Sequence, residues 1–386
     1  MATLPLDSIC THFGSLEDPR MDRTKLHWLL EIMALAVCAV IGGADTWVDV
    51  EDFGNAKLKW FRKFLELPNG IPSHDTFGEV FARLDPEQFQ TCFLNWVQAI
   101  VLLAESQVVA MDGKALRRSH DHRLGKDAIR RVSAWASVNR VVLGQVKVDE
   151  KSNEITALPA LLQVLDLAGC IVTIDALGTQ TNIAAPSRGS STAIVNHEAD
   201  YVLPVKENQG HLYEDVVATF TEAEAQQFHA VPHDYAQMIN GGHGRIETRE
   251  CWTIDRPDYL EALRTASEWA GLSSIARVRA TRRTETQTTI QARYYISSLP
   301  GQAAQILNAT RTHWSIENEL HWTLDIAFRE DECRIRKGAG DQNFAVLRHI
   351  ALNLLKQEKT AKIGIKAKRF KAGWDEAYLC RVLAAA

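Results

Sequence analysis

Residues 170–175 read Cys-Ile-Val-Thr-Ile-Asp, a nearly continuous apolar run that ends in a carboxylate. A run of this kind is typical of a strand that is buried on both faces of a sheet. Residues 107–112 read Gln-Val-Val-Ala-Met-Asp and end in the same way. Similar runs alternate with helical patterns further along the chain, so we predict an α/β core built on a mixed sheet.

The segments on either side of these two runs differ in pattern. Before residue 105 the apolar residues recur at spacings of three and four, which is typical of helices. Three strand patterns cluster between residues 245 and 299. We therefore expect four parts: a helical N-terminal domain at 1–104, an α/β domain at 105–355, a β-rich insertion within it at about 243–299, and a basic C-terminal tail at 356–386.

Composition excludes several classes of protein. The chain has 386 residues, of which 46% are hydrophobic and 24% charged, as in ordinary globular proteins. The longest apolar stretch, 29–41, is shorter than the ~20 residues of a membrane span and contains Glu31. The seven cysteines are scattered, which favours reduced thiols. We therefore expect a cytoplasmic protein that has no membrane partner.

The net charge of −5 argues at first against a nucleic-acid partner. The charge is unevenly distributed, however, because residues 356–371 hold seven Lys or Arg and one Glu. Local positive charge binds phosphates in a salt-dependent way. The sequence therefore predicts that this tail contributes to salt-sensitive DNA binding.

Three acidic residues form the most informative pattern. Asp112 and Asp175 follow apolar strands, and ligands of α/β sheets bind at the carboxyl ends of strands. Glu317 lies in a helical segment in which His313 and His321 are spaced four residues to either side, along one ridge. Carboxylate oxygens are the ligands that Mg²⁺ prefers, and two such ions about 4 Å apart support phosphoryl transfer. We predict a magnesium site at these residues.

Other interpretations of the same residues stay open. An Asp after a strand is commonly a helix cap or turn former, and Glu317 alone fits a solvated helix face. The spacing of His313, Glu317 and His321 also suits zinc, although the chain has no His-Glu-x-x-His motif and no cysteine at ligand spacing.

Several basic residues are candidate DNA contacts. Lys206 follows a buried strand, and Lys114 follows Asp112 by two residues. A further group comes after the glutamate helix, next to acidic residues, where phosphate contacts would position a duplex: Arg334, Arg336, Lys337 and Arg348. The alternatives are an ordinary polar loop at Lys206 and a solvated loop of mixed charge after the helix.

Three segments together resemble the blocks of a DDE transposase, in the H-repeat-associated branch of bacterial insertion-sequence transposases. They are Val-Ala-Met-Asp-Gly-Lys-Ala-Leu-Arg at 109–117, Ile-Val-Thr-Ile-Asp-Ala at 171–176 and His-Trp-Ser-Ile-Glu-Asn at 313–318. The opening segment, with Pro-Ser-His-Asp-Thr-Phe at 72–77, resembles the N-terminal domain of that branch. The resemblance extends from about residue 9 to residue 356.

The resemblance implies an RNase H-like core in which Asp112, Asp175 and Glu317 are catalytic and bind Mg²⁺ or Mn²⁺. It also places the β-rich insertion between the last core strand and the glutamate helix. Such enzymes cut double-stranded DNA at transposon ends and join the freed 3′-hydroxyl to target DNA. We expect a homodimer in the synaptic complex and a cytoplasmic, nucleoid-associated protein.

The chain departs from the pattern of that branch at two places. Residues 186–191 look like a short insertion after the second aspartate, and Arg118 stands where glycine is usual. Two alternatives to an active transposase follow: a decayed or domesticated copy that binds DNA without catalysis, and a stand-alone RNase H-like nuclease.

Overall fold

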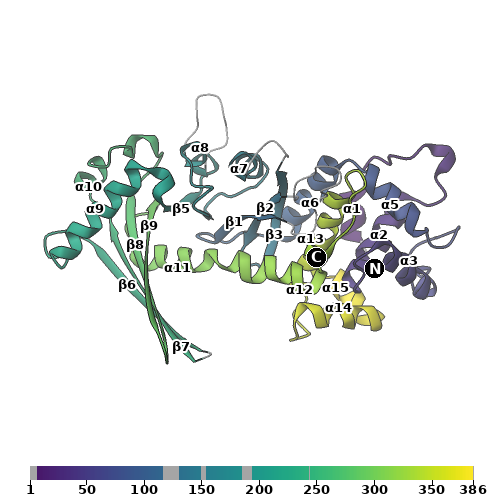
Figure 1. The fold of residues 1–386 in the computed structure, drawn as a ribbon. Coiled ribbons are helices and arrows are strands. Elements are labelled where there is room, and N and C mark those ends of the chain that lie inside the picture. Colours follow the sequence, from purple (N-terminus) through teal and green to yellow (C-terminus); the bar gives the residue numbers. More distant parts are fainter. Residues whose placement is uncertain (1–6, 116–129, 149–153, 185–193, 243, 386) are drawn as a thin grey trace.

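The computed structural model describes residues 7–115, 130–148, 154–184, 194–242 and 244–385, and a mixed sheet forms its centre (Figure 1). The core strands lie in the order β3-β2-β1-β4-β5. β4 is parallel to β1 and to β5, and β2 is antiparallel to β1 and β3. This is the arrangement of an RNase H-like core, so the predicted fold class is confirmed. The strands are β1 (Val108–Ala115), β2 (Arg130–Ala136), β3 (Val141–Val148), β4 (Ile171–Ile174) and β5 (Asp200–Val205).

Four further strands continue this sheet. β9 pairs antiparallel with β5, and the sheet then runs through β8 and β7 to β6. The insertion predicted at 243–299 therefore begins too late, because β6 precedes it. Nearly every β6 side chain is exposed, so its sequence lacks the apolar alternation that signals a strand. The strands are β6 (Asp234–Gly242), β7 (Arg245–Ile254), β8 (Ser274–Thr284) and β9 (Thr288–Ser297).

The N-terminal part is helical, as predicted. α2 is buried on nearly all sides, which explains why its sequence is apolar apart from Glu31. Asp85 caps the amide of Glu87, and Pro86 takes the first helical position, so α6 begins there. None of the helices in the described ranges is both long and apolar enough to cross a membrane. The elements are α1 (Asp7–Phe13), η1 (Asp22–Thr24), α2 (Leu29–Ile41), α3 (Trp47–Ala56), α4 (Leu58–Phe61), α5 (His74–Arg83) and α6 (Pro86–Ile100).

Helices cover both parts of the sheet, and α13 joins the core to the N-terminal helices. Asn343 donates from its side chain to the carbonyls of Phe81 and Leu84, and Asn353 donates to the carbonyl of Val142. The elements between the strands are α7 (Glu154–Gln163), α8 (Thr181–Ala184), η2 (Ile194–His197), η3 (Glu207–Gln209), α9 (His211–Ala225), α10 (Pro257–Glu261) and η4 (Ala266–Glu268). After the strands come α11 (Ala303–His313), η5 (Ile316–His321), α12 (Trp322–Phe328), η6 (Glu330–Glu332) and α13 (Gly340–Gln357).

The C-terminal segment is folded, which corrects the expected basic tail. It forms α14 (Ile365–Trp374) and α15 (Glu376–Leu383). Lys368 and Arg369 are buried and donate hydrogen bonds to main-chain carbonyls of the protein. These two residues therefore do not face DNA. Lys359, Lys362 and Lys366 remain exposed on this segment.

Candidate active site

Asp112 and Asp175 lie side by side toward the carboxyl ends of two neighbouring central strands, β1 and β4. The parallel register of β1 and β4 ends with Met111 opposite Ile174, so the two aspartates follow at the same level. Neighbouring strands are about 4.8 Å apart, so Asp112 in β1 and Asp175 directly after β4 are close neighbours. The expectation that β1 ends in Asp112 needs correction, because its pairing with β2 continues to Ala115.

Local contacts fix both aspartates. Asp112 Oδ1 accepts the amide of Gly113 at 2.9 Å, and its Oδ2 lies 3.5 Å from His321 Nδ1. Asp175 Oδ1 accepts the amide of Gly178 at 2.9 Å. A Cβ at Gly178 would lie 2.3 Å from the Ile174 side chain, so only glycine fits this turn.

Glu317 lies in a π-helical turn, η5, between α11 and α12. The sequence predicted an α-helix here, with His313, Glu317 and His321 along one ridge. The wider π-turn changes that spacing, and such turns are frequent at functional sites. Ile316 and Leu320 are buried, whereas Glu317 is exposed.

The two histidines that flank Glu317 in sequence contact the core strands, His313 at β4 and His321 at β1. His313 Nδ1 lies 3.0 Å from the hydroxyl of Thr173, and His321 lies next to Asp112. Burial lowers the pKa of each histidine to about 4, so both are neutral near pH 7. They are therefore suited to hydrogen bonding rather than to neutralising the carboxylates.

One cavity of about 240 Å³ brings the three acidic residues together. We call it the carboxylate pocket. Lys206 also lines it and is exposed, and Arg293 reaches it from β9. Its other lining residues are Thr173, Ile174, Ala176, Val202, Pro204, Tyr295, Thr310, His313 and Trp314.

The ligand atoms that the three carboxylates of the pocket offer are of the type that a hard cation prefers. Three carboxylates offer only oxygen donors, which suit Mg²⁺ and Mn²⁺ better than zinc. Within the described ranges, no three His, Cys, Asp or Glu side chains are grouped tightly enough to hold a metal ion. The acidic residues are thus gathered at one cavity but do not surround a single point.

Sequence reasoning missed residues that support the pocket. Asn208 Nδ2 donates to the carbonyl of Ala176 at 3.0 Å, and Gln209 Nε2 donates to the carbonyl of Thr179 at 2.9 Å. The loop after β5 thereby holds the loop that follows Asp175. Arg293 lies 5.0 Å from the centre of the Trp314 ring. Arg293 reaches the pocket only because β9 pairs with β5, and no local sequence pattern predicts that pairing.

Lys114 is not placed to bind DNA, contrary to the prediction. Its ammonium pairs with Asp325 and lies 3.0 Å from Glu330 Oε2. Burial opposes ionisation of Glu330, yet Lys114, Arg348 and Arg131 lower its pKa to about 2. Lys114 is therefore part of an internal ion network that connects β1 to the segment after α12.

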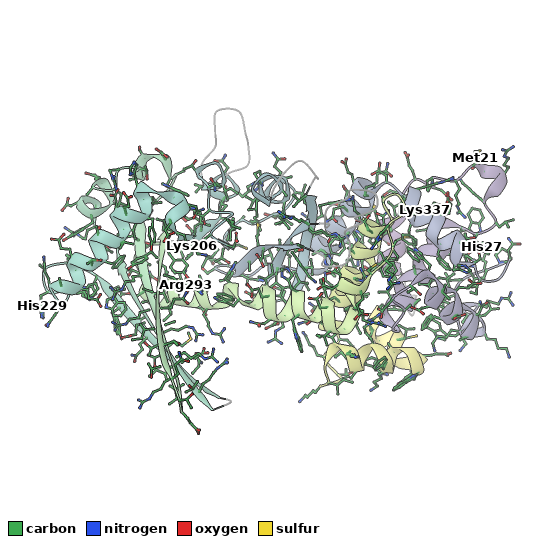
Figure 2. All side chains as sticks on the ribbon, in the orientation of Figure 1. Met21, His27, Lys206, His229, Arg293 and Lys337 are labelled. Atoms are coloured by element: carbon green, nitrogen blue, oxygen red, sulfur yellow. The ribbon has the colours of Figure 1, made fainter. Side chains whose placement is uncertain are left out.

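The other basic candidates lie away from the carboxylate pocket. Arg348 is 1% exposed and packs over Phe344, so it is not placed to contact DNA, contrary to the prediction. Arg334, Arg336 and Lys337 line a different cavity of about 810 Å³, beside α3 and α5. Figure 2 shows Lys337 among the N-terminal helices, far from Lys206 and Arg293.

Two features named from the sequence lie outside the described residues. They are Arg118 and the segment 186–191.

A sheet of this topology, with acidic residues just past the point where the pairing of β1 with β4 ends, defines the RNase H-like class of folds. The family model described as "Transposase DDE domain" matches residues 100–354, and the model described as "DDE_Tnp_1-associated" matches residues 10–97. The chain belongs to the DDE transposase family. Domains of this family generally depend on divalent metal ions.

Relatives match over the whole chain. "H repeat-associated putative transposase YhhI" of Escherichia coli (strain K12) is 38% identical over 99% of both chains. "Putative transposase YncI" of Escherichia coli O157:H7 is 37% identical over 99% of this chain and 95% of its own. The cryo-EM structure of the piggyBac transposase synaptic complex with hairpin DNA is a distant likeness. It covers 96% of this chain and 76% of that one, at 10% identity and a TM-score of 0.39.

Proposed function

We propose that this chain is a DNA transposase that cuts at transposon ends and joins the freed ends to target DNA through Asp112, Asp175 and Glu317. The carrying observation is that these three carboxylates line one cavity, although they come from β1, the loop after β4 and η5. Family membership supports the reaction class, and the carboxylate pocket supports these residues as its catalytic groups.

The reaction needs two phosphoryl transfers. In the first, water attacks the phosphorus, the bond to the 3′-oxygen breaks, and that oxygen leaves as a 3′-hydroxyl. In the second, this hydroxyl attacks a target phosphodiester, so that one ester bond forms as another breaks. A bound divalent cation supplies Lewis-acid activation of the attacking oxygen and stabilises charge on the leaving oxygen.

The residues of the chain hold the reacting groups. Asp112 and Asp175 present carboxylate oxygens from β1 and from the residue after β4, and Glu317 presents a third carboxylate from η5. Lys206 is exposed at the pocket, where its ammonium would bind a non-bridging phosphate oxygen. Asn208 and Gln209 hold the loop after Asp175 in place.

The test is strand cleavage by single variants. We expect D112N, D175N and E317Q each to lose at least about 100-fold in Mg²⁺-dependent nicking of plasmid DNA, since transition-state charge would be unsupported. E66Q, at an exposed carboxylate in the loop between α4 and α5, serves as a matched control and keeps its activity. DNA affinity, measured by gel shift, should persist in all four.

The alternatives give different results in the same assay. A stand-alone nuclease would nick DNA without joining ends, and a decayed copy would bind DNA without nicking it in Mg²⁺ or Mn²⁺. Nicking that survives any one of the three substitutions would remove that residue from the proposed site.

A further inference from the structure

A second cavity, of about 440 Å³, adjoins the carboxylate pocket. It lies between β7, β8 and β9 on one side and the end of α11 with η5 on the other. Figure 1 shows the free ends of these strands extending past α11. The two cavities share Arg293, Tyr295, Thr310 and Trp314, so they form one continuous surface. We call the second cavity the arginine groove.

The arginine groove carries an excess of positive charge. Only one acidic residue, Glu247, lines it, and Arg245 and Arg249 pair with that residue at 3.1 and 2.5 Å. The other three arginines form no ion pair with any residue in the described ranges. They are Arg282, Arg293 and Arg311.

The opposite face of the same strands is neutralised. Arg277 pairs with Glu224 at 2.8 Å, and Arg279 pairs with Glu250 at 2.9 Å. Both guanidinium groups also lie over the ring of Trp252, at 4.8 and 4.9 Å from its centre. Arg277 and Arg279 thus have carboxylate partners, whereas three of the five groove arginines have none within ion-pair distance among the described residues and can bind an external anion.

We propose that the arginine groove binds the sugar-phosphate backbone of DNA next to the phosphodiester that the carboxylate pocket cleaves. The proposal rests on the proposed function and names the surface that holds its substrate. Guanidinium groups match phosphate geometry with paired donors. Contacts to the backbone position a duplex without reading its sequence, so the groove serves any DNA that enters the site.

Adjacent arginines of β8 provide a matched test. Arg282 lines the groove, while Arg283 is exposed on the opposite face, because side chains alternate along a strand. The variants are R282Q, R311Q and their combination, with R283Q as control. Each full-length chain is titrated with a labelled random-sequence duplex of roughly 30 base pairs at several salt concentrations, so that backbone contacts dominate.

The groove predicts a change in salt dependence. The slope of log affinity against log salt should fall by about one for each groove arginine removed, and by about two in the double variant. R283Q should keep the wild-type slope. Equal changes in R282Q and R283Q, or no change in the groove variants, would overturn the proposal.

Nicking of plasmid DNA by the same proteins separates this proposal from the proposed function. If the wild-type chain binds DNA with the groove signature but does not nick it, the groove stands and the enzymatic function fails. If it nicks DNA and the groove variants bind as it does, the enzymatic function stands and the groove fails.

Discussion

Lys114 connects the strand that carries Asp112 to the helical segment after Glu317 by ion pairs. It lies two residues after Asp112 on β1, and its ammonium contacts the carboxylates of Asp325 and Glu330. Glu330 is 4% exposed, so its charge depends on protein partners rather than on water. The network therefore ties β1 to the end of the helical segment that carries Glu317.

Removal of this ammonium should destabilise the protein. We expect K114M to lower the free energy of unfolding by about 3 kcal/mol, because the buried Glu330 carboxylate loses the nearer of its cationic partners and keeps Arg131 at 3.5 Å. K114R, which keeps the charge, should lose less. In urea denaturation, K114M/E330Q should lose less than the sum of its single variants. Strict additivity would show that the pair is not coupled.

His349 should make stability depend on pH. Burial lowers the pKa of its imidazole to about 3, whereas an unfolded histidine titrates near 6.5. Between these values the unfolded state binds more protons, so stability falls as the pH falls below about 6.5. From pH 7 to pH 5 this histidine should cost about 2 kcal/mol.

The substitution H349Q removes this titration. The loss of unfolding free energy between pH 7 and pH 5 should therefore be smaller in H349Q by about 2 kcal/mol. H229Q, at an exposed position, is the control and should match the wild type. An unchanged pH dependence in H349Q would contradict the assignment.

For single residues, the sequence predicted correctly those positions that follow from the pattern of the residues next to them. Asp112 and Asp175 were found because each follows an apolar run, and such runs place their ends at one sheet edge. The roles of Lys114 and Arg348 were predicted wrongly. Their partners are distant in sequence, and residue type alone does not distinguish a buried cation from one that binds phosphate.

Among the elements, η5 shows a limit of periodicity. The sequence predicted that Glu317 lies in a regular helix, whereas the structure has α-helix on either side of it and a π-turn around Glu317 itself. A π-turn adds one residue to one turn of the helix, which leaves the apolar pattern nearly unchanged. Likewise, β7, β8 and β9 alternate visibly and were predicted, whereas β6 is exposed and was not.

α14 is anchored by a cation rather than by an apolar stripe alone. Arg369 donates to the carbonyls of Val40 and Ala44 and pairs with Asp45 at 2.9 Å. These carbonyls lie at the C-terminal end of α2 and just beyond it, where main-chain acceptors lack helical partners. Arg369 thus completes the hydrogen bonding of a helix far away in sequence.

Loss of this anchor should be costly. We expect R369M to lower the free energy of unfolding by about 3 kcal/mol, since the buried carbonyl of Ala44 and the carboxylate of Asp45 both lose this donor. K366M, on the same helix but exposed, should stay within about 0.5 kcal/mol of the wild type. A similar stability for both variants in urea denaturation would show that α14 is not anchored in this way.

Across the whole molecule, the local charge of each surface is more informative than the net charge of the chain. The chain carries −5, yet unpaired arginines gather in the arginine groove beside the carboxylate pocket. The sequence suggested that the C-terminal segment supplies this positive charge. The structure instead assigns two of its basic residues to the interior, and the groove is built by pairing of strands that no local pattern reveals.

The central claim is that Asp112, Asp175 and Glu317 act as one site despite their distance in sequence. The most direct test is Mg²⁺-dependent joining of a duplex carrying the ends of the encoding element to plasmid DNA, by the wild-type chain and by E317Q at equal DNA occupancy. We predict that the wild type forms joined products and that E317Q lowers their yield at least about 100-fold. Joining by E317Q at the wild-type rate would contradict the account.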